Sequence, residues 1–312
     1  MLFDILKVSL GFVCLYFGAQ WTVTGAIRIG NALNLAKAFL GLTVVAFSTS
    51  SPELMVNLLA ASRGYTAFSL SNISGSNLAN LCVGFGLCGL FSRLAVSREV
   101  FRADLIYFCI GPVLMLLFFF FTPDHSLPLF AAAPLLCLIG AYLYSKKSTL
   151  SGTDVESNEP KRLGSGIFLL ILGASLLYLG GELVLRAAVS IAEILGISDA
   201  IIGFTIVAVG TSIPDIMASI IAARRGENAI AVGNLLGSNI FNIFLVIGGT
   251  LIVYGKGLTT DSGILMDYCL VAACSVLFYA LINWTRLSPR IWGGGLLSIY
   301  LVYTTIRVIA GT

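Results

Sequence analysis

The chain has 312 residues, of which 58% are hydrophobic and only 11% charged, and its mean hydropathy is +0.98. A chain this apolar cannot fold as a water-soluble globule, so the composition predicts a multi-pass integral membrane protein embedded in a lipid bilayer. The net charge of +3 comes from basic residues that stand singly or in pairs at the ends of apolar segments. We find no basic patch suited to nucleic acid, and nucleic-acid binding is excluded.

Histidine and cysteine usage argues against a resident metal or redox cofactor. His125 is the single histidine, so a histidine metal site is excluded by the count. The seven cysteines lie in apolar runs without CxxC or Cys/His spacing, and we interpret them as small hydrophobic residues. We expect no cofactor and find no motif that implies a protein partner.

Ten apolar runs are long enough to cross the hydrocarbon core, which takes about 20 helical residues. The first run is interpreted as a retained helix, because it has no basic region before it and no small-residue cleavage site. The expected helices lie near residues 5–30, 36–62, 66–91, 101–122, 126–145, 164–194, 199–224, 228–254, 263–284 and 291–309.

The second half of the chain repeats the first. Residues 41–86 align without a gap with residues 203–248, at a constant offset of 162, and the match extends to Gly11 and Gly18 of the first expected helix. Each half has five expected helices, and an odd number forces the halves to insert in opposite orientations. The fold class predicted is therefore all-α, with ten transmembrane helices in two inverted five-helix repeats. The repeats are residues 1–145 and 164–312.

The segment 146–163 is the single long polar stretch and is predicted to be a linker. If the amino terminus is outside, most Lys and Arg residues fall on the inner side of the membrane. The positive-inside rule therefore favours both termini outside and the linker in the cytoplasm.

Two carboxylates occupy equivalent positions in the repeats. Glu53 and Asp215 each follow a Thr-Ser-x-Pro sequence inside an apolar helix. A carboxylate there costs about 2.5 to 3.5 kcal/mol on translocon insertion scales, so each is a candidate functional residue. Their equivalence predicts one shared site.

Hydroxyl and amide residues recur at helical spacing around these carboxylates. Thr49 and Thr211 lie one turn before the acids, and each following helix carries Gly-Ser-Asn-x-x-Asn. Pro52 and Pro214 remove backbone donors, which is expected to free carbonyls around Ala46–Thr49 and Ala208–Thr211. The result is a set of hard oxygen donors that suits Ca2+ and Na+ equally. The alternative is that the hydroxyls and amides only hold helices together, but this role does not require an ionisable group.

Another ionisable pair lies on the sixth expected helix. Glu182 and Arg186 are one turn apart and are predicted to neutralise each other. Their counterparts Gln20 and Thr24 are uncharged, which favours a structural role for the pair over a site.

The repeated Thr-Ser-x-Pro-Glu/Asp and Gly-Ser-Asn-x-x-Asn motifs resemble those of the sodium/calcium exchanger family, prokaryotic type, within the cation/calcium exchanger superfamily. The resemblance implies ion sites at mid-membrane, sliding first and sixth helices, and location in a prokaryotic cell (inner) membrane. The ligands that it implies are Glu53, Asp215, Thr49, Ser50, Thr211, Ser212, Ser76, Ser238, Asn80 and Asn242, with backbone oxygens of Ala46 and Ala208.

Three departures from the family pattern stand out. Ser48 and Ser71 occupy positions where the second repeat has Gly210 and Gly233, the usual glycines. Asp215 replaces the commoner Glu. The chain also lacks the large regulatory insert of animal exchangers, so that form of allosteric Ca2+ regulation is not expected.

We expect a transporter and not an enzyme: a secondary antiporter that exchanges Na+ for Ca2+ by alternating access. The alternative is a Ca2+/H+ exchanger, although proton-coupled relatives typically show Gly-Asn-x-x-Glu in place of Thr-Ser-x-Pro. An intramembrane aspartyl protease would need a Gly-x-Gly-Asp type motif, which the sequence lacks.

Overall fold

The computed structural model describes residues 2–92, 94, 96–122, 125–146, 162–194, 208–284 and 287–310. Within these residues the protein is helical, with an antiparallel bridge between Leu127 and Leu258, so the all-α prediction is confirmed. The main helices are α1 (Leu2–Leu33), α3 (Ala46–Ser62), α4 (Thr66–Leu78), α5 (Phe85–Phe91), α6 (Arg98–Phe121), α7 (Ala132–Ser145), α8 (Leu163–Ile194), α10 (Ala208–Arg224), α11 (Asn228–Phe241), α12 (Gly248–Tyr254), α13 (Ser262–Trp284) and α14 (Pro289–Ala310).

Six helical segments among the described residues are long and apolar enough to cross a membrane, or seven if one bent segment counts as a single span. That segment runs from α2 (Lys37–Phe39) through the π-helix η1 (Leu40–Val45) into α3, and bends by 48° between Lys37–Ser51 and Glu53–Ser62. The expected run 199–224 lies partly outside the described residues, and α10 covers 17 of its positions. The total of ten spans therefore stays a prediction.

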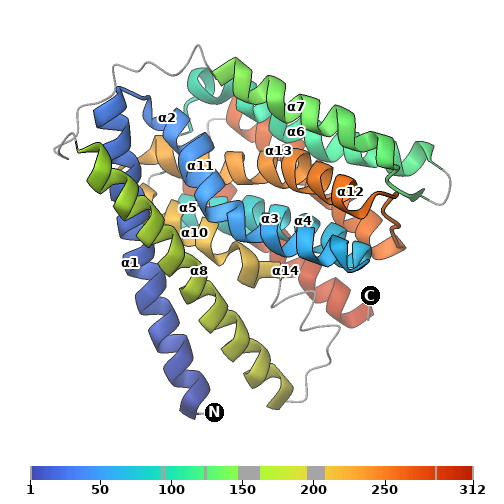
Figure 1. The fold of residues 1–312 in the computed structure, drawn as a ribbon, viewed down its shortest axis with the longest axis horizontal. Coiled ribbons are helices and arrows are strands. Elements are labelled where there is room, and N and C mark those ends of the chain that lie inside the picture. The colour runs from blue at the N-terminus through green and yellow to red at the C-terminus, as the bar shows by residue number, and fades with distance from the viewer. Residues whose placement is uncertain are drawn as a thin grey trace.

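Helices α1 and α8 lie side by side along one flank of the molecule (Figure 1). Glycines let their backbones touch: a Cβ on Gly18 would lie 2.9 Å from the carbonyl oxygen of Gly173, and a Cβ on Gly173 would lie 2.7 Å from that of Gly18. The same reciprocal contact joins Gly11 with Gly180, and also Gly25 with Gly166. Glycines spaced seven residues apart thus make α1 and α8 one closely packed antiparallel pair.

In each repeat the regular α-helical hydrogen bonding is interrupted near the predicted ligands. Asn80 lies in a π-helical segment, η2 (Ala79–Gly84), and Asn242 begins another, η7 (Asn242–Ile247). In α3, Pro52 has no N–H to donate to the Ser48 carbonyl, and the Ser51 hydroxyl donates to it instead at 3.0 Å. The carbonyls predicted to be freed, Ala46–Thr49, lie in the first turn of α3, and the departure from regular α-helix comes directly before them, in the π-helical turn η1.

Each half of the chain also carries a buried Asp-Tyr-cation triad, which the sequence analysis did not identify. In the first half, Asp104 on α6 accepts from the Tyr142 hydroxyl at 2.9 Å and pairs with Lys146, which directly follows α7. In the second half, Asp267 on α13 accepts from Tyr303 and lies 3.7 Å from Arg307, both on α14. The triads join corresponding helices and place both cations at helix ends.

Candidate ion-binding site

The predicted ligands come from four helical segments that meet in the core. Helix α3 contributes Glu53, α10 contributes Asp215, and the carboxylates are 3% and 0% exposed. They lie close enough to repel each other electrostatically. Segments α4–η2 and α11–η7 add the Ser and Asn residues of the Gly-Ser-Asn-x-x-Asn motifs. The structure brings together the ten predicted side-chain ligands: Thr49, Ser50, Glu53, Ser76, Asn80, Thr211, Ser212, Asp215, Ser238 and Asn242. Thr211 is half-buried, and the other nine side chains are buried.

Asp215 is surrounded by donors from both repeats. Asn80 donates its side-chain N–H to Oδ2 at 2.9 Å, and the Ser238 hydroxyl donates to Oδ1 at 3.0 Å. A buried carboxylate needs such donors because it has lost its water.

Other bonds cross between the repeats beside this carboxylate. The hydroxyls of Ser76 and Thr211 lie 3.1 Å apart, and the Ser212 hydroxyl donates to the Ser76 carbonyl at 3.4 Å. First-repeat and second-repeat helices are therefore joined through the predicted ligands themselves.

Glu53 is in a different environment, because within the described part of the chain neither oxygen of its buried carboxylate has a hydrogen-bond partner. The side-chain oxygens of Asn80 and Asn242 are also buried without a partner. The two amides direct their N–H groups elsewhere, Asn80 to Asp215 and Asn242 to Asn77 Oδ1 at 3.1 Å. Buried polar atoms are normally satisfied, and these acceptors are oxygens of the kind that bind Na+ and Ca2+.

Two backbone positions complete the predicted set. Ala46 is the first residue of α3 after the π-helical turn, and its carbonyl accepts a long bond of 3.3 Å from the Thr49 hydroxyl. Ala208 is the first residue of α10, and the segment before it, 195–207, lies outside the described residues. The carbonyls predicted to be freed in the second repeat, Ala208–Thr211, lie in the first turn of α10.

Several supporting residues lie outside the predicted ligand set. Asn234 donates to the Asp215 carbonyl at 3.0 Å and to the Ser219 hydroxyl at 2.9 Å, and it accepts from Thr49 at 3.1 Å. Asn234 on α11 thereby joins α10, which carries Asp215, to α3, which carries Glu53. Asn77 orients Asn242, and the first Asn of the Gly-Ser-Asn-x-x-Asn motif was the available signal for this role.

The site has few charges for a metal centre. Across the part of the chain that the structure describes, no group of three or more His, Cys, Asp or Glu side chains could hold a metal ion. The two carboxylates are supplemented by neutral hydroxyl and amide oxygens, a donor set suited to hard cations that bind reversibly.

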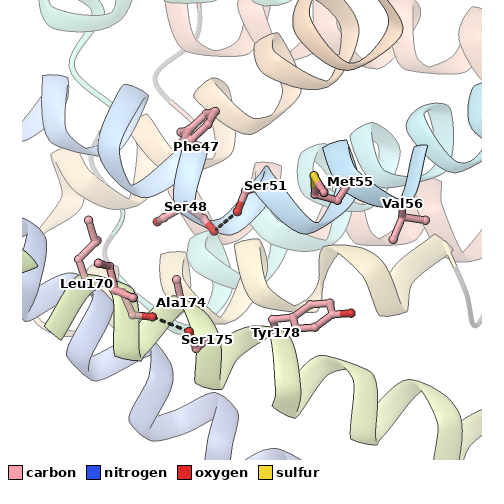
Figure 2. A pocket seen from close by; sticks show the side chains of 10 residues that line it. Phe47, Ser48, Ser51, Met55, Val56, Leu170, Ala174, Ser175 and Tyr178 are labelled. Atoms are coloured by element: carbon pink, nitrogen blue, oxygen red, sulfur yellow. Dashed lines mark hydrogen bonds between the residues drawn. The ribbon is translucent and has the colours of Figure 1, made fainter. Parts of the chain in front are cut away.

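Two cavities lie beside α3, and Glu53 lines the smaller one. A small one of about 60 Å3 is lined by Glu53, Thr211 and Glu182 from three different helices. A larger one of about 570 Å3 lies between α3 and α8 (Figure 2). The hydroxyls of Ser51 and Ser175 in the larger cavity are bonded to backbone carbonyls of their own helices, so it presents a mainly apolar surface.

The sequence is similar to a known protein family and to individual proteins. The sequence profile described as Sodium/calcium exchanger protein matches residues 5–146 and 165–309. CaxA of Alkalimonas amylolytica is 35% identical, over 82% of this chain and 82% of its own length. The sodium/calcium exchanger MaX1 of Methanosarcina acetivorans is 28% identical, over 78% of this chain and 81% of its own.

The fold is also similar to that of solved structures. The sodium-calcium exchanger NCX_Mj superposes with a TM-score of 0.81 at 28% identity, covering 96% of this chain and 97% of its own. Its structures were determined after soaking with different amounts of Na+, Ca2+ or Sr2+. With the profile matching nearly the whole length, the chain belongs to the sodium/calcium exchanger protein family.

Proposed function

We propose that the protein is a secondary antiporter that moves Ca2+ in exchange for Na+ by alternating access, at the site between Glu53 and Asp215. One observation carries the proposal: among the described residues the buried side-chain oxygens of Glu53 and Asn80 have no hydrogen-bond partner, and Asn80 itself bonds to a second buried carboxylate, Asp215. Burying such acceptors without donors is costly unless a cation binds them.

Charge balance explains why the two ions would compete. Two carboxylates neutralise one Ca2+, and adding Na+ to the same oxygens would leave excess positive charge in a region of low dielectric. Each ion therefore excludes the other, which is the requirement for exchange. The ligands that we propose are Glu53, Asp215, Thr49, Ser50, Thr211, Ser212, Ser76, Ser238, Asn80 and Asn242, with the carbonyls of Ala46 and Ala208.

We further propose ten transmembrane helices, in repeats 1–145 and 164–312 joined by the linker 146–163. The paired π-helices η2 and η7 and the two Asp-Tyr-cation triads support equivalence of the halves. The reciprocal glycine contacts support movement of α1 and α8 as one unit. We place the protein in a prokaryotic inner membrane with both termini outside and the linker cytoplasmic.

Calorimetry on the purified protein tests the site. Ca2+ should bind to the wild type and be displaced by Na+, whereas choline should displace none. Displacement by protons alone, with no effect of Na+, would favour the Ca2+/H+ alternative.

A further inference from the structure

Glu182 on α8 lines the same small cavity as the proposed ligands Glu53 and Thr211. The cavity volume of about 60 Å3 is enough for one or two water molecules. The Glu182 side chain is 34% exposed, whereas Glu53 is almost completely buried. The cavity therefore connects a buried, unpartnered carboxylate with a second carboxylate that is accessible from outside the core.

Arg186 forms an ion pair with Glu182. Its Nε atom lies 2.6 Å from Glu182 Oε1, and its own side chain is 73% exposed. The carboxylate of this pair also lines the cavity that reaches Glu53.

The equivalent position in the first repeat has the opposite electrostatic character. Gln20 and Thr24 of α1 correspond to Glu182 and Arg186, and neither is charged. The guanidinium of Arg225 donates to the Gln20 carbonyl at 3.3 Å and to the Thr24 hydroxyl at 2.8 Å. The two repeats thus differ at this position: α8 carries a carboxylate, and α1 carries an amide beside a bound guanidinium.

We propose that Glu182 recruits cations to Glu53 from one face of the membrane only, and that Arg186 weakens this recruitment. The face is the one opposite the linker, because α8 begins beside the linker at Leu163 and reaches Glu182 in its second half. A carboxylate at the mouth of a low-dielectric cavity raises the local cation concentration and the rate of capture. This inference rests on the proposed cation transport and adds a residue that makes the two faces of the carrier unequal.

The test measures the KM for Ca2+ separately at each face, in right-side-out and inverted membrane vesicles at low ionic strength. Glu182→Gln should raise the KM at the face opposite the linker by about three- to tenfold, with Vmax unchanged and the KM at the linker face unchanged. Arg186→Gln should lower the KM at the same face, and Glu182→Asp should stay close to the wild type. High salt should remove these differences, because it screens exposed charges.

Gln20→Glu is the matched variant, and it should lower the KM at the linker face alone. Equal effects of Glu182→Gln at both faces, or a fall in Vmax at constant KM, would overturn the role of Glu182. Absence of Ca2+ flux in the wild type would instead overturn the proposed function together with this inference. Normal wild-type flux with an unchanged KM in Glu182→Gln would overturn only the recruitment role.

Discussion

Asn80 of the first repeat donates a hydrogen bond of 2.9 Å to the Asp215 carboxylate of the second. The bond leaves the Asn80 side-chain oxygen unpartnered and buried next to that carboxylate. One amide thus both stabilises an acid in the core and presents an acceptor to a cation. The arrangement explains why a neutral amide occupies this position, because a third carboxylate would add charge that one Ca2+ cannot balance.

The two acids should both be essential for transport. Glu53→Gln or Asp215→Asn removes one of the charges that balance Ca2+, so each should abolish Ca2+ uptake into proteoliposomes while thermal unfolding stays cooperative. Glu227→Gln is the control. Glu227 lies outside the site and forms an ion pair with Lys37, with 2.9 Å between Oε2 and Nζ, so this variant should transport normally. Uptake near the wild-type rate in either site variant would rule out the proposed ligands.

Close packing of α1 on α8 should be sensitive to a single methyl group. Gly18→Ala places a Cβ 2.7 Å from the Leu177 backbone nitrogen, which forces the helices apart. Overpacking of this kind costs about 1–3 kcal/mol, and the melting temperature should fall. Gly140→Ala is the control, since nothing lies within 4 Å of its added Cβ. Equal melting temperatures for the two variants would show that the glycine contacts are not tight.

Breaking a buried triad should cost more than breaking an exposed ion pair. Lys146→Met leaves Asp104, which is fully buried, without its cation and should destabilise the protein by about 3–5 kcal/mol. Adding Asp104→Asn should recover much of this loss, because the uncompensated charge is then gone. Arg186→Met breaks the much more exposed pair with Glu182 and should cost far less. Chemical denaturation in detergent measures all three, and similar costs for Lys146→Met and Arg186→Met would contradict the account.

Inverted topology can be tested at two equivalent exposed positions. Ser62 ends α3 and Arg224 ends α10, and the repeat relates them. Single cysteines there, in a background without the seven native cysteines, should react with an impermeant maleimide from opposite faces of the membrane. Labelling from the same face would exclude opposite insertion of the repeats.

Much of the fold could be predicted from the sequence because hydropathy and repetition are strong signals. Apart from the run 199–224, which lies partly outside the described residues, the apolar runs match the described helices within a few residues, from Leu2–Leu33 to Pro289–Ala310. The π-helical turns were not predictable, since they depend on how Asn80 and Asn242 bond to neighbouring helices in three dimensions. The triads were missed for the same reason: Asp104 and Lys146 lie 42 positions apart, with no periodicity to connect them.

At the site, the sequence identified which side chains meet but not their individual roles. The repeat made Glu53 and Asp215 equivalent, yet only Asp215 is surrounded by donors. That difference arises from cross-repeat contacts, which no local pattern encodes. Glu182 was interpreted as half of a structural pair because its counterpart Gln20 is neutral, whereas the cavity that it shares with Glu53 indicates a further role.

Ion coupling is the central claim, and one flux measurement tests it most directly. Proteoliposomes loaded with radioactive Ca2+ are diluted into Na+, into choline, or into choline with an inward proton gradient of matched driving force. The account predicts rapid release of Ca2+ in Na+ and none above the leak in the other two media. Release driven by the proton gradient, with no effect of Na+, would contradict the account and establish the Ca2+/H+ alternative.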